Sequence, residues 1–401
     1  MGKQFIPPSI TGDGTGFATG GSVLDHSFGK GDPFTLGVEE EYMLLDEGTL
    51  DLVQHVEAVL AATEGHELEQ RVNPELMQSV LEIATPICRT PAEVESELRR
   101  LRTYVASLAT ERGLRVGSAG THPFSLFERQ RITARDRYRH LVDQLQYVAR
   151  RELIFGLHIH VAVDDPERAI CVVNGLLAHL SSLLALSASS PFWRGELTGL
   201  ASSRQMVFAA FPRSGPPPRF RDYADYAEVV GQLEKTGCIA DYTHIWWDIR
   251  LHPRFGTVEI RVCDAVTLIE DAVALAAFCQ ALVKLYSERH AVGAETPSYH
   301  RILTTENKWL AARYGLEAPV MDLATGRRNR VPVAQLVRRT LREIEPHARE
   351  LGSDRELEGI RDILSRGNGS DRQRRVWNAN RDIVEVVREI ADATEQAAVP
   401  A

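Results

Sequence analysis

Four segments of the chain carry charged residues at every second position, and this period of two constrains the fold more than any other feature. Alternate side chains of a strand point to opposite faces, so each charged pair shares one face and the residues between them form the other. The pairs are Glu39 and Glu41 in residues 34–45, His158 and His160 in 154–163, Asp248 and Arg250 in 243–251, and Glu259 and Arg261 in 256–264. The intervening residues are mostly apolar. The pattern therefore predicts strands with one covered face and one charged face.

A solvated face of an antiparallel sheet would show the same alternation. Two details favour a shared binding site over a solvent-exposed face of the sheet. Lysine is absent from all four segments, although solvated strands usually carry it. The small residues Gly37, Gly156 and Ala162 leave room for a ligand to lie against the sheet.

A fifth segment, residues 72–85, supplies two more carboxylates. The set then comprises Glu39, Glu41, Glu75, Glu82 and Glu259. Carboxylates gathered in one place repel one another and disfavour their own ionised forms, and divalent cations relieve that repulsion. Many oxygen ligands with only one or two imidazoles favour Mg²⁺ or Mn²⁺ over zinc.

Two arginines on these faces, Arg250 and Arg261, indicate phosphate chemistry. A metal ion bridges phosphate and carboxylate oxygens, while guanidinium groups bind the remaining phosphate oxygens. A purely hydrolytic metal site has no evident need for two arginines.

Helical periodicity accounts for much of the remaining chain. The clearest helix spans residues 91–112, where Thr90 and Glu93 form a capping box and Pro91 takes the first position. We expect further helices at about 137–152, 167–188, 268–290, 331–351, 354–366 and 371–397. Residues 169–189 carry no charge, but Asn174, His179 and four serines favour a buried helix over a membrane span. The fold class is thus α+β, with a helical section at about 331–397.

The chain boundaries and composition narrow the function classes. Residues 1–33 hold eight glycines, which predicts a flexible tail, or alternatively a lid, before one domain at 34–397. The net charge of −9 argues against nucleic acid and anionic membranes as partners. Five cysteines, an odd number without zinc-like spacing, are typical of a reduced cytoplasmic protein.

These segments, taken in order, resemble the carboxylate-amine ligases of the type 2 glutamate-cysteine ligase family. The carriers are GVEEEY (37–42), NPELMQSVLEIAT (73–85), GTHPF (120–124), GLHIHV (156–161), WWDIR (246–250), GTVEIRVCDA (256–265) and ENKWLAARYG (306–315). The resemblance implies a fold of the glutamine-synthetase type: a curved, mainly antiparallel sheet with helices packed outside. It also implies that ATP and metal ions bind in the concavity of the sheet.

The resemblance assigns roles residue by residue. The implied metal ligands are Glu39, Glu41, Glu75, Glu82, His160 and Glu259; the implied nucleotide contacts are Glu39, His160, Arg204 and Arg261; the implied catalytic residues are Arg261, Glu259 and Arg250. Asn307 and Arg313 are further anion-binding candidates. The implied reaction forms an acyl phosphate from ATP and a carboxylate, and an amine then attacks it to give an amide.

Several alternatives stay open at this level. A metal-dependent hydrolase would use His158, His160 and the carboxylates, and a non-catalytic homologue would bind nucleotide without turnover. Glutamate is the expected acid, the amine is open, and kinship favours a homodimer. Cys263 is either a substrate contact or, as we favour, a small apolar residue that fills space in the core. The tryptophans at 246, 247 and 309 either stack on adenine or pack in the core and at the rim of the sheet.

Overall fold

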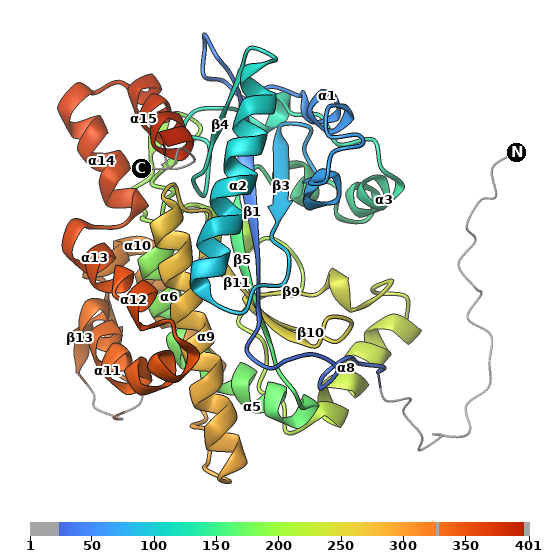
Figure 1. Cartoon of the computed structure of the whole chain (residues 1–401), viewed down its shortest axis with the longest axis vertical. Coiled ribbons are helices and arrows are strands. Elements are labelled where there is room, and N and C mark those ends of the chain that lie inside the picture. The colour runs from blue at the N-terminus through green and yellow to red at the C-terminus, as the bar shows by residue number, and fades with distance from the viewer. Residues whose placement is uncertain (1–23, 324, 326–328, 397–401) are drawn as a thin grey trace, which may run out of the picture.

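A computed structural model describes residues 24–323, 325 and 329–396. Its centre is a seven-stranded sheet in the order β10-β11-β5-β1-β3-β2, with β4 paired to β1 on the same edge as β5, beyond the end of β5 (Figure 1). The strands are β1 (Leu36–Asp46), β2 (Val72–Pro74), β3 (Val80–Ala84), β4 (Leu114–Gly117), β5 (Gly156–Ala162), β10 (Ile249–His252) and β11 (Thr257–Asp264). Every pair in it is antiparallel. This confirms the predicted fold class.

The register of the sheet brings the charged residues together. Glu41 lies opposite Glu82 across β1 and β3, and Glu39 lies opposite His158 across β1 and β5. On the other side of β5, His160 lies opposite Glu259. Because these pairs occupy one face, the period of two in the sequence becomes one continuous row of ionisable groups across four strands.

Long helices cover the other face of the sheet. They are α2 (Pro91–Thr110), α5 (Pro166–Leu176), α6 (Leu180–Ser187) and α9 (Ile269–Ala291), of which α2 and α9 cross in front of the strands in Figure 1. The stretch Pro166–Ser187 is long and apolar enough to cross a membrane by composition, but 94% of its apolar 18-residue window is buried inside the molecule. The prediction of a buried core helix is therefore confirmed.

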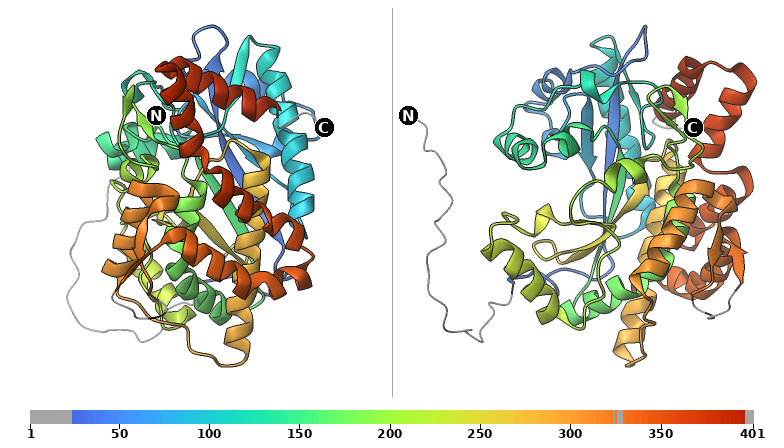
Figure 2. Two further views of the ribbon diagram at one scale, coloured as in Figure 1. Left: turned by 90° about the vertical axis from the view of Figure 1, so that its left-hand side faces the viewer. Right: turned by 180° about the vertical axis from the view of Figure 1, so that it is seen from behind.

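The C-terminal part is helical, as predicted, and packs outside this layer (Figure 2). It comprises α11 (Val333–Leu351), α12 (Asp354–Leu357), α13 (Gly359–Arg366), α14 (Gly369–Asn380) and α15 (Ile383–Gln396). Asn368 caps α14 in a reciprocal capping box with Asp371, so this helix begins two residues before the predicted start. The last helix, α15, packs against β4 and α2.

Shorter elements complete the described chain. Their bounds are α1 (Val56–Ala61), α3 (Asp136–Leu145), α4 (Tyr147–Arg150), α7 (Arg204–Phe208), α8 (Tyr223–Lys235), α10 (Arg301–Tyr314), β6 (Phe192–Trp193), β7 (Glu196–Leu197), β8 (Ser214–Gly215), β9 (Trp246–Trp247), β12 (Pro319–Met321) and β13 (Arg330–Pro332). The charged face of the sheet is flanked by α3 and α8 in Figure 1.

The strand predicted over residues 243–251 is wrong in its first half. Residues 242–244 form a turn of 3₁₀ helix, and β9 pairs in parallel with β8 instead of joining the main sheet. Only β10 continues the sheet. Asp248, predicted to share a face with Arg250, instead binds Lys308 Nζ of α10 at 2.6 and 2.8 Å through its two carboxylate oxygens.

A β-bulge interrupts β11 and changes the face of Cys263. The register shifts between Ile260 and Cys263, so two residues of β11 oppose one residue of β5 and Cys263 pairs with Leu157. Cys263 was predicted to share a face with Glu259 and Arg261, and that is wrong. It packs in the apolar core, which confirms its reading as a filler.

Part of the predicted tail packs against the folded chain. Residues 24–33 are described, and Phe28 is buried in the main core. The N–H of Ser27 donates to Pro253 O at 2.8 Å. The backbone of Ser27 also passes close to Gly256, since a Cβ added at Gly256 would lie 2.6 Å from the carbonyl oxygen of Ser27. The packed chain thus includes residues before the predicted boundary at Phe34. The rest of the predicted tail, residues 1–23, lies outside the described residues.

Candidate active site

Three groups of potential metal ligands line the charged face of the sheet. Each group has its ligand atoms within 4.8 Å of one another. The groups are Glu39, His160 and Glu259; Glu39, Glu82 and His158; and Glu41, Glu75 and Glu82. Since Glu39 and Glu82 each belong to two groups, the three are continuous. All six metal ligands implied by the resemblance are therefore brought together, with His158 beside them.

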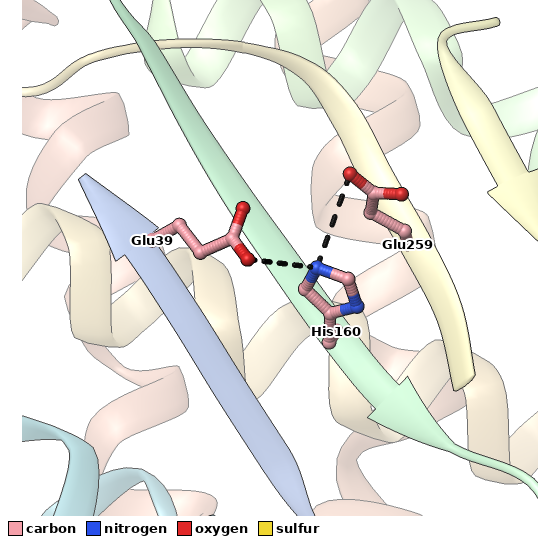
Figure 3. A group of neighbouring side chains, drawn as sticks. All are labelled: Glu39, His160 and Glu259. Carbon is pink, nitrogen blue, oxygen red and sulfur yellow. Dashed lines mark ion pairs between the residues drawn. The ribbon is translucent and has the colours of Figure 1, made fainter. Parts of the chain in front are cut away.

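The first group is shown in Figure 3, where Glu39 and Glu259 approach the ring of His160 from the two neighbouring strands. His160 Nε2 lies 3.5 Å from Glu39 Oε1 and 3.9 Å from Glu259 Oε1. The other ring nitrogen, Nδ1, lies 3.0 Å from Thr257 Oγ1, which orients the ring. Burial opposes protonation of His160, but the charges of Glu259 and Glu39 outweigh it and raise its pKa.

Two arginines hold Glu259 from opposite sides. Arg250 Nε donates to Glu259 Oε2 at 2.7 Å, and Arg261 Nη1 donates to Glu259 Oε1. Burial would raise the pKa of Glu259, but Arg250 and Arg261 hold it well below its usual range. Arg250 also donates through Nη1 to the carbonyl oxygens of Thr243 and Ile245, at 3.0 and 3.1 Å. Glu259 is therefore a fixed, ionised carboxylate.

The carboxylates at the other end of the row, Glu41, Glu75 and Glu82, have raised pKa values. Burial and the charge of Glu75 raise the pKa of Glu41 to about 7. Burial, followed by the charges of Glu39, Glu75 and Glu41, raises the pKa of Glu82 well above its usual range. Burial also raises the pKa of Glu75. The nearby arginines do not outweigh burial and mutual repulsion at this end of the row, so a cation would stabilise the ionised carboxylates.

The neighbouring residues Glu39 and His158 are shifted in the opposite direction, toward their unprotonated forms. Burial opposes ionisation of Glu39, but the charge of His160 and the hydrogen bond with His158 lower its pKa. Burial and the charge of Arg261 lower the pKa of His158 to about 4. A carboxylate and a neutral imidazole are the forms that bind metal ions.

The residues present fit a hard divalent cation. His160 Nε2 is buried and makes no hydrogen bond within the described chain, although it faces two carboxylates. The remaining donors are carboxylate oxygens, the ligands that Mg²⁺ and Mn²⁺ prefer.

Three adjoining cavities open from this row. The first, the carboxylate cavity, has a volume of about 240 Å³. It is lined by Glu39, Glu75, Glu82, Arg137, Tyr138, His158, His160, Thr243, Trp246, Arg250, His252, Glu259 and Arg261. It contains most of the residues that the sequence singled out, so the site predicted from scattered segments is a single place in the structure.

The second, the apolar cavity, has a volume of about 550 Å³ and shares Glu39 and His160 with the first. Its other lining residues are Ser27, Gly31, Thr35, Leu36, Gly37, Val38, Arg71, Ala84, Thr85, Ile87, Ala162, Val163, Arg254, Phe255, Gly256 and Thr257. Ile87 and Phe255 are 82% and 58% exposed, so this cavity presents apolar side chains to a ligand. Residues 27 and 31 belong to the segment assigned by sequence to the tail.

The third, the aromatic cavity, extends from the other end of the row. Its lining comprises Glu41, Glu75, Leu76, Met77, Val80, Arg137, Tyr138, Leu141, Glu152, Ile154, His158, Arg204, Phe208, Phe211, His244, Trp246 and Arg261. The Arg204 side chain lies against Gly156, because a Cβ added at Gly156 would stand 2.6 Å from Nη2 of Arg204. Nε of Arg204 is buried and has no hydrogen-bond partner among the described residues. The four implied nucleotide contacts thus divide between cavities: Glu39 and His160 face the first two, Arg204 the third, and Arg261 the first and third.

Several candidates lie outside all three cavities. The side-chain amide of Asn307 exchanges two hydrogen bonds of 2.8 Å with the backbone of Met321, and Arg313 donates to Gly199 O. Trp247 packs in the core and Trp309 is exposed, whereas Trp246 lines two cavities.

Sequence analysis missed Arg137, Tyr138 and Glu152. Arg137 and Tyr138 lie on α3, whose helical pattern gives no sign that this face meets the sheet. Glu152 was detectable, because the alternation of β5 extends back through Ile154 to Glu152, and both side chains line the same cavity as His158.

A carboxylate- and arginine-lined site on the open face of an antiparallel sheet fits an ATP-dependent ligase that joins an acid to an amine, and the chain's relatives belong to that class. Within that class the chain belongs to the glutamate-cysteine ligase family 2, whose model matches residues 35–393. The family predicted from the sequence is thus confirmed.

Curated relatives match over nearly the whole chain. A provisionally named glutamate–cysteine ligase 2-1 of Rubrobacter xylanophilus is 43% identical over 91% of this chain and 96% of its own length. A similarly named protein of Sorangium cellulosum is 44% identical over 90% of this chain and 96% of its own.

Solved structures share the fold at low identity. A glutamate–cysteine ligase of Francisella tularensis in complex with AMP has a TM-score of 0.66 and 13% identity, covering 92% of this chain and 89% of that one. A bifunctional glutathione synthetase of Pasteurella multocida has a TM-score of 0.67 and 15% identity, covering 91% of this chain and 53% of that one.

Proposed function

We propose that the protein uses ATP to phosphorylate a carboxylate and then joins the acyl group to an amine as an amide. The observation that carries the proposal is the row of carboxylates and imidazoles that ends on Arg261 and lies between an apolar and an aromatic cavity. Phosphoryl transfer depends mainly on alignment and charge neutralisation, which such a row provides. A serine or cysteine nucleophile is not required.

The apolar cavity is the proposed place of the adenine base. Its walls are aliphatic and aromatic side chains, and it meets the carboxylate cavity at Glu39 and His160. A nucleotide with its base in the apolar cavity would therefore direct its phosphates toward Arg261. The AMP bound by the Francisella relative is consistent with a nucleotide site in this fold.

Mg²⁺ or Mn²⁺, held by Glu39, Glu41, Glu75, Glu82, His160 and Glu259, would neutralise charge on the phosphate oxygens. Arg261 would bind the phosphoryl oxygens that become most negative during transfer, since among the described residues its Nε is buried without a partner and its Nη1 is held by Glu259 alone. Arg250 holds Glu259 in place through Nε and leaves Nη2 without a hydrogen bond in the described chain. Arg204 would bind a carboxylate in the aromatic cavity.

The aromatic cavity is the proposed place of the acid and of the attacking amine. The relatives' names favour glutamate as the acid and cysteine as the amine. The amine's nitrogen forms the new C–N bond, the bond between the acyl carbon and the phosphate oxygen breaks, and inorganic phosphate leaves.

We also propose a cytoplasmic location, one domain over residues 34–397, and a homodimer. Light scattering would test the homodimer.

The test is ADP release by the purified protein with Mg²⁺ over a panel of amino acids, singly and in pairs, followed by mass measurement of the product. We expect release only when an acceptable acid is supplied, and an amide product only when an amine is added. Absence of nucleotide binding, together with stoichiometric zinc, would instead support the metal-dependent hydrolase. ATP binding without substrate-stimulated turnover would support the non-catalytic homologue.

A further inference from the structure

The aromatic cavity holds charges of both signs at separate places. Its carboxylates are Glu41, Glu75 and Glu152, and its guanidinium groups are Arg137, Arg204 and Arg261. Glu41 accepts the backbone N–H of Gly156 at 2.5 Å, and Glu75 accepts that of Leu76 at 2.6 Å. By contrast, the Glu152 carboxylate makes no hydrogen bond or ion pair with any residue that the structure describes. A half-buried carboxylate without a partner among the described residues is available to a cationic group of a ligand that enters the cavity.

The backbone fixes Glu152 toward the cavity. Its N–H donates to Ala149 O at 3.1 Å, and the N–H of Phe155 donates to Gly120 O at 3.0 Å. Leu153 and Phe155 are buried in the second apolar cluster. Because Glu152 and Ile154 alternate with these core residues, turning Glu152 away from the cavity would pull Leu153 out of the core.

A metal ion is not the expected partner of Glu152. The groups of potential ligands whose atoms lie within 4.8 Å of one another use Glu41, Glu75 and Glu82 at this end of the row, and Glu152 belongs to none of them among the described residues. The cavity that Glu152 lines also presents aromatic and aliphatic side chains such as Phe208, Phe211 and Trp246. An organic cation on a carbon chain matches this combination of a carboxylate and an apolar wall.

We propose that Glu152 binds the α-ammonium group of the amino acid that serves as the acid substrate. The proposal rests on the proposed function and deepens it, because it selects acids that carry an ammonium group over simple dicarboxylates. Arg204, which lines the same cavity and is proposed above to bind a carboxylate there, would bind the α-carboxylate. The distal carboxylate then reaches Arg261 and the metal-binding row. Glu152 is thus a specificity-determining residue that touches substrate away from the reacting atoms.

The test compares glutamate with glutarate, which lacks only the ammonium group. Binding of each is measured by calorimetry in the presence of Mg²⁺ and a non-hydrolysable ATP analogue, and ADP release is measured in parallel with ATP. Wild type is compared with Glu152→Gln, which keeps the size, and Glu152→Asp, which keeps the charge. Glu196→Gln, the same chemical change on an exposed strand, is the matched control.

We expect Glu152→Gln to weaken glutamate binding by about tenfold or more, the scale of a lost charge-assisted hydrogen bond. Glutarate binding should change by less than about twofold, since the lost partner is absent from that ligand. Glu152→Asp should recover part of the glutamate affinity, and Glu196→Gln should match wild type for both ligands.

Equal losses for glutamate and glutarate would overturn the assignment of Glu152 while leaving the proposed function intact. Unchanged glutamate binding in Glu152→Gln would overturn it as well. If wild type neither binds glutamate nor releases ADP with any amino acid, the proposed function fails and the inference fails with it. Thermal melting of each variant distinguishes these outcomes from misfolding.

Discussion

Strand β1 presents three consecutive glutamates to two different environments. Glu40 points to the helix-covered face, where Arg102 of α2 binds both of its oxygens at 2.9 and 2.6 Å. Arg102 also donates to the carbonyl oxygens of Thr267 and Val266, and both charged side chains are 1% exposed. Glu39 and Glu41 point to the open face, where other carboxylates are their neighbours. Glutamate therefore stabilises the fold on one face and is available for ligand binding on the other. The difference is that an arginine faces Glu40, whereas other carboxylates face Glu39 and Glu41.

The comparison predicts that substitutions on the two faces fail in different ways. On the open face, Glu259→Gln should lower amide-forming ADP release by about a thousandfold or more, because the charge that aligns Arg261 and the cation is lost. The melting temperature should stay close to that of wild type. Steady-state ADP release and thermal melting check this, and substantial turnover in the variant would contradict the placement of Glu259 in the site.

On the covered face, Arg102→Ala should destabilise the protein by about 3–5 kcal/mol, since it leaves the buried carboxylate of Glu40 without its partner. Chemical denaturation measures this loss. The paired substitution Arg102→Met with Glu40→Leu should recover most of the stability, because it removes both buried charges. If Arg102→Ala melted like wild type yet lost activity, the division between the two faces would be wrong.

Acid should act on the stability of the fold through the buried His122. Its Nδ1 accepts the N–H groups of Phe124 and Ser125, and its Nε2 lies 2.9 Å from Leu50 O, so the fold requires the neutral ring. Burial lowers the pKa of His122 to about 4, below its unfolded value of about 6.5. The unfolded chain therefore binds the proton first, and stability is lost as the pH falls from 6.5 toward 4, by about 3 kcal/mol from this residue.

The check is chemical denaturation of wild type and His122→Asn across that pH range, with saturating Mg²⁺ in both. The variant is expected to be less stable at neutral pH but to lose less stability on acidification. Parallel pH curves for the two proteins would show that His122 does not titrate on unfolding.

The smallest predicted effect is a gain in stability. Glu82→Gln should stabilise the metal-free protein by about 1 kcal/mol at pH 8, because it removes a buried charge that repels Glu39, Glu75 and Glu41. The same change should weaken the stabilisation that Mg²⁺ confers on melting. Titration of both proteins with Mg²⁺, followed by melting temperature, sharpens the contrast with Arg102→Ala, where charge removal destabilises.

The sequence predicted the open face well because strand alternation is a local property. Glu39, His160 and Glu259 followed from spacing alone, and the register then placed them side by side. Asp248 was misassigned because its partner, Lys308, lies sixty residues away and only tertiary packing reveals it. Neither the packing of residues 24–33 nor the approach of α3 leaves a periodic signal, so the cavity walls that they supply could not be predicted.

The bulge in β11 makes the length of that strand as important as its composition. Arg261 falls within the bulge, between Glu259 on the open face and Cys263 in the core. Deleting one residue between them would restore regular pairing and send one of these side chains to the wrong side, exposing a thiol or burying a charge. Insertions and deletions should therefore be selected against here even where single substitutions are tolerated.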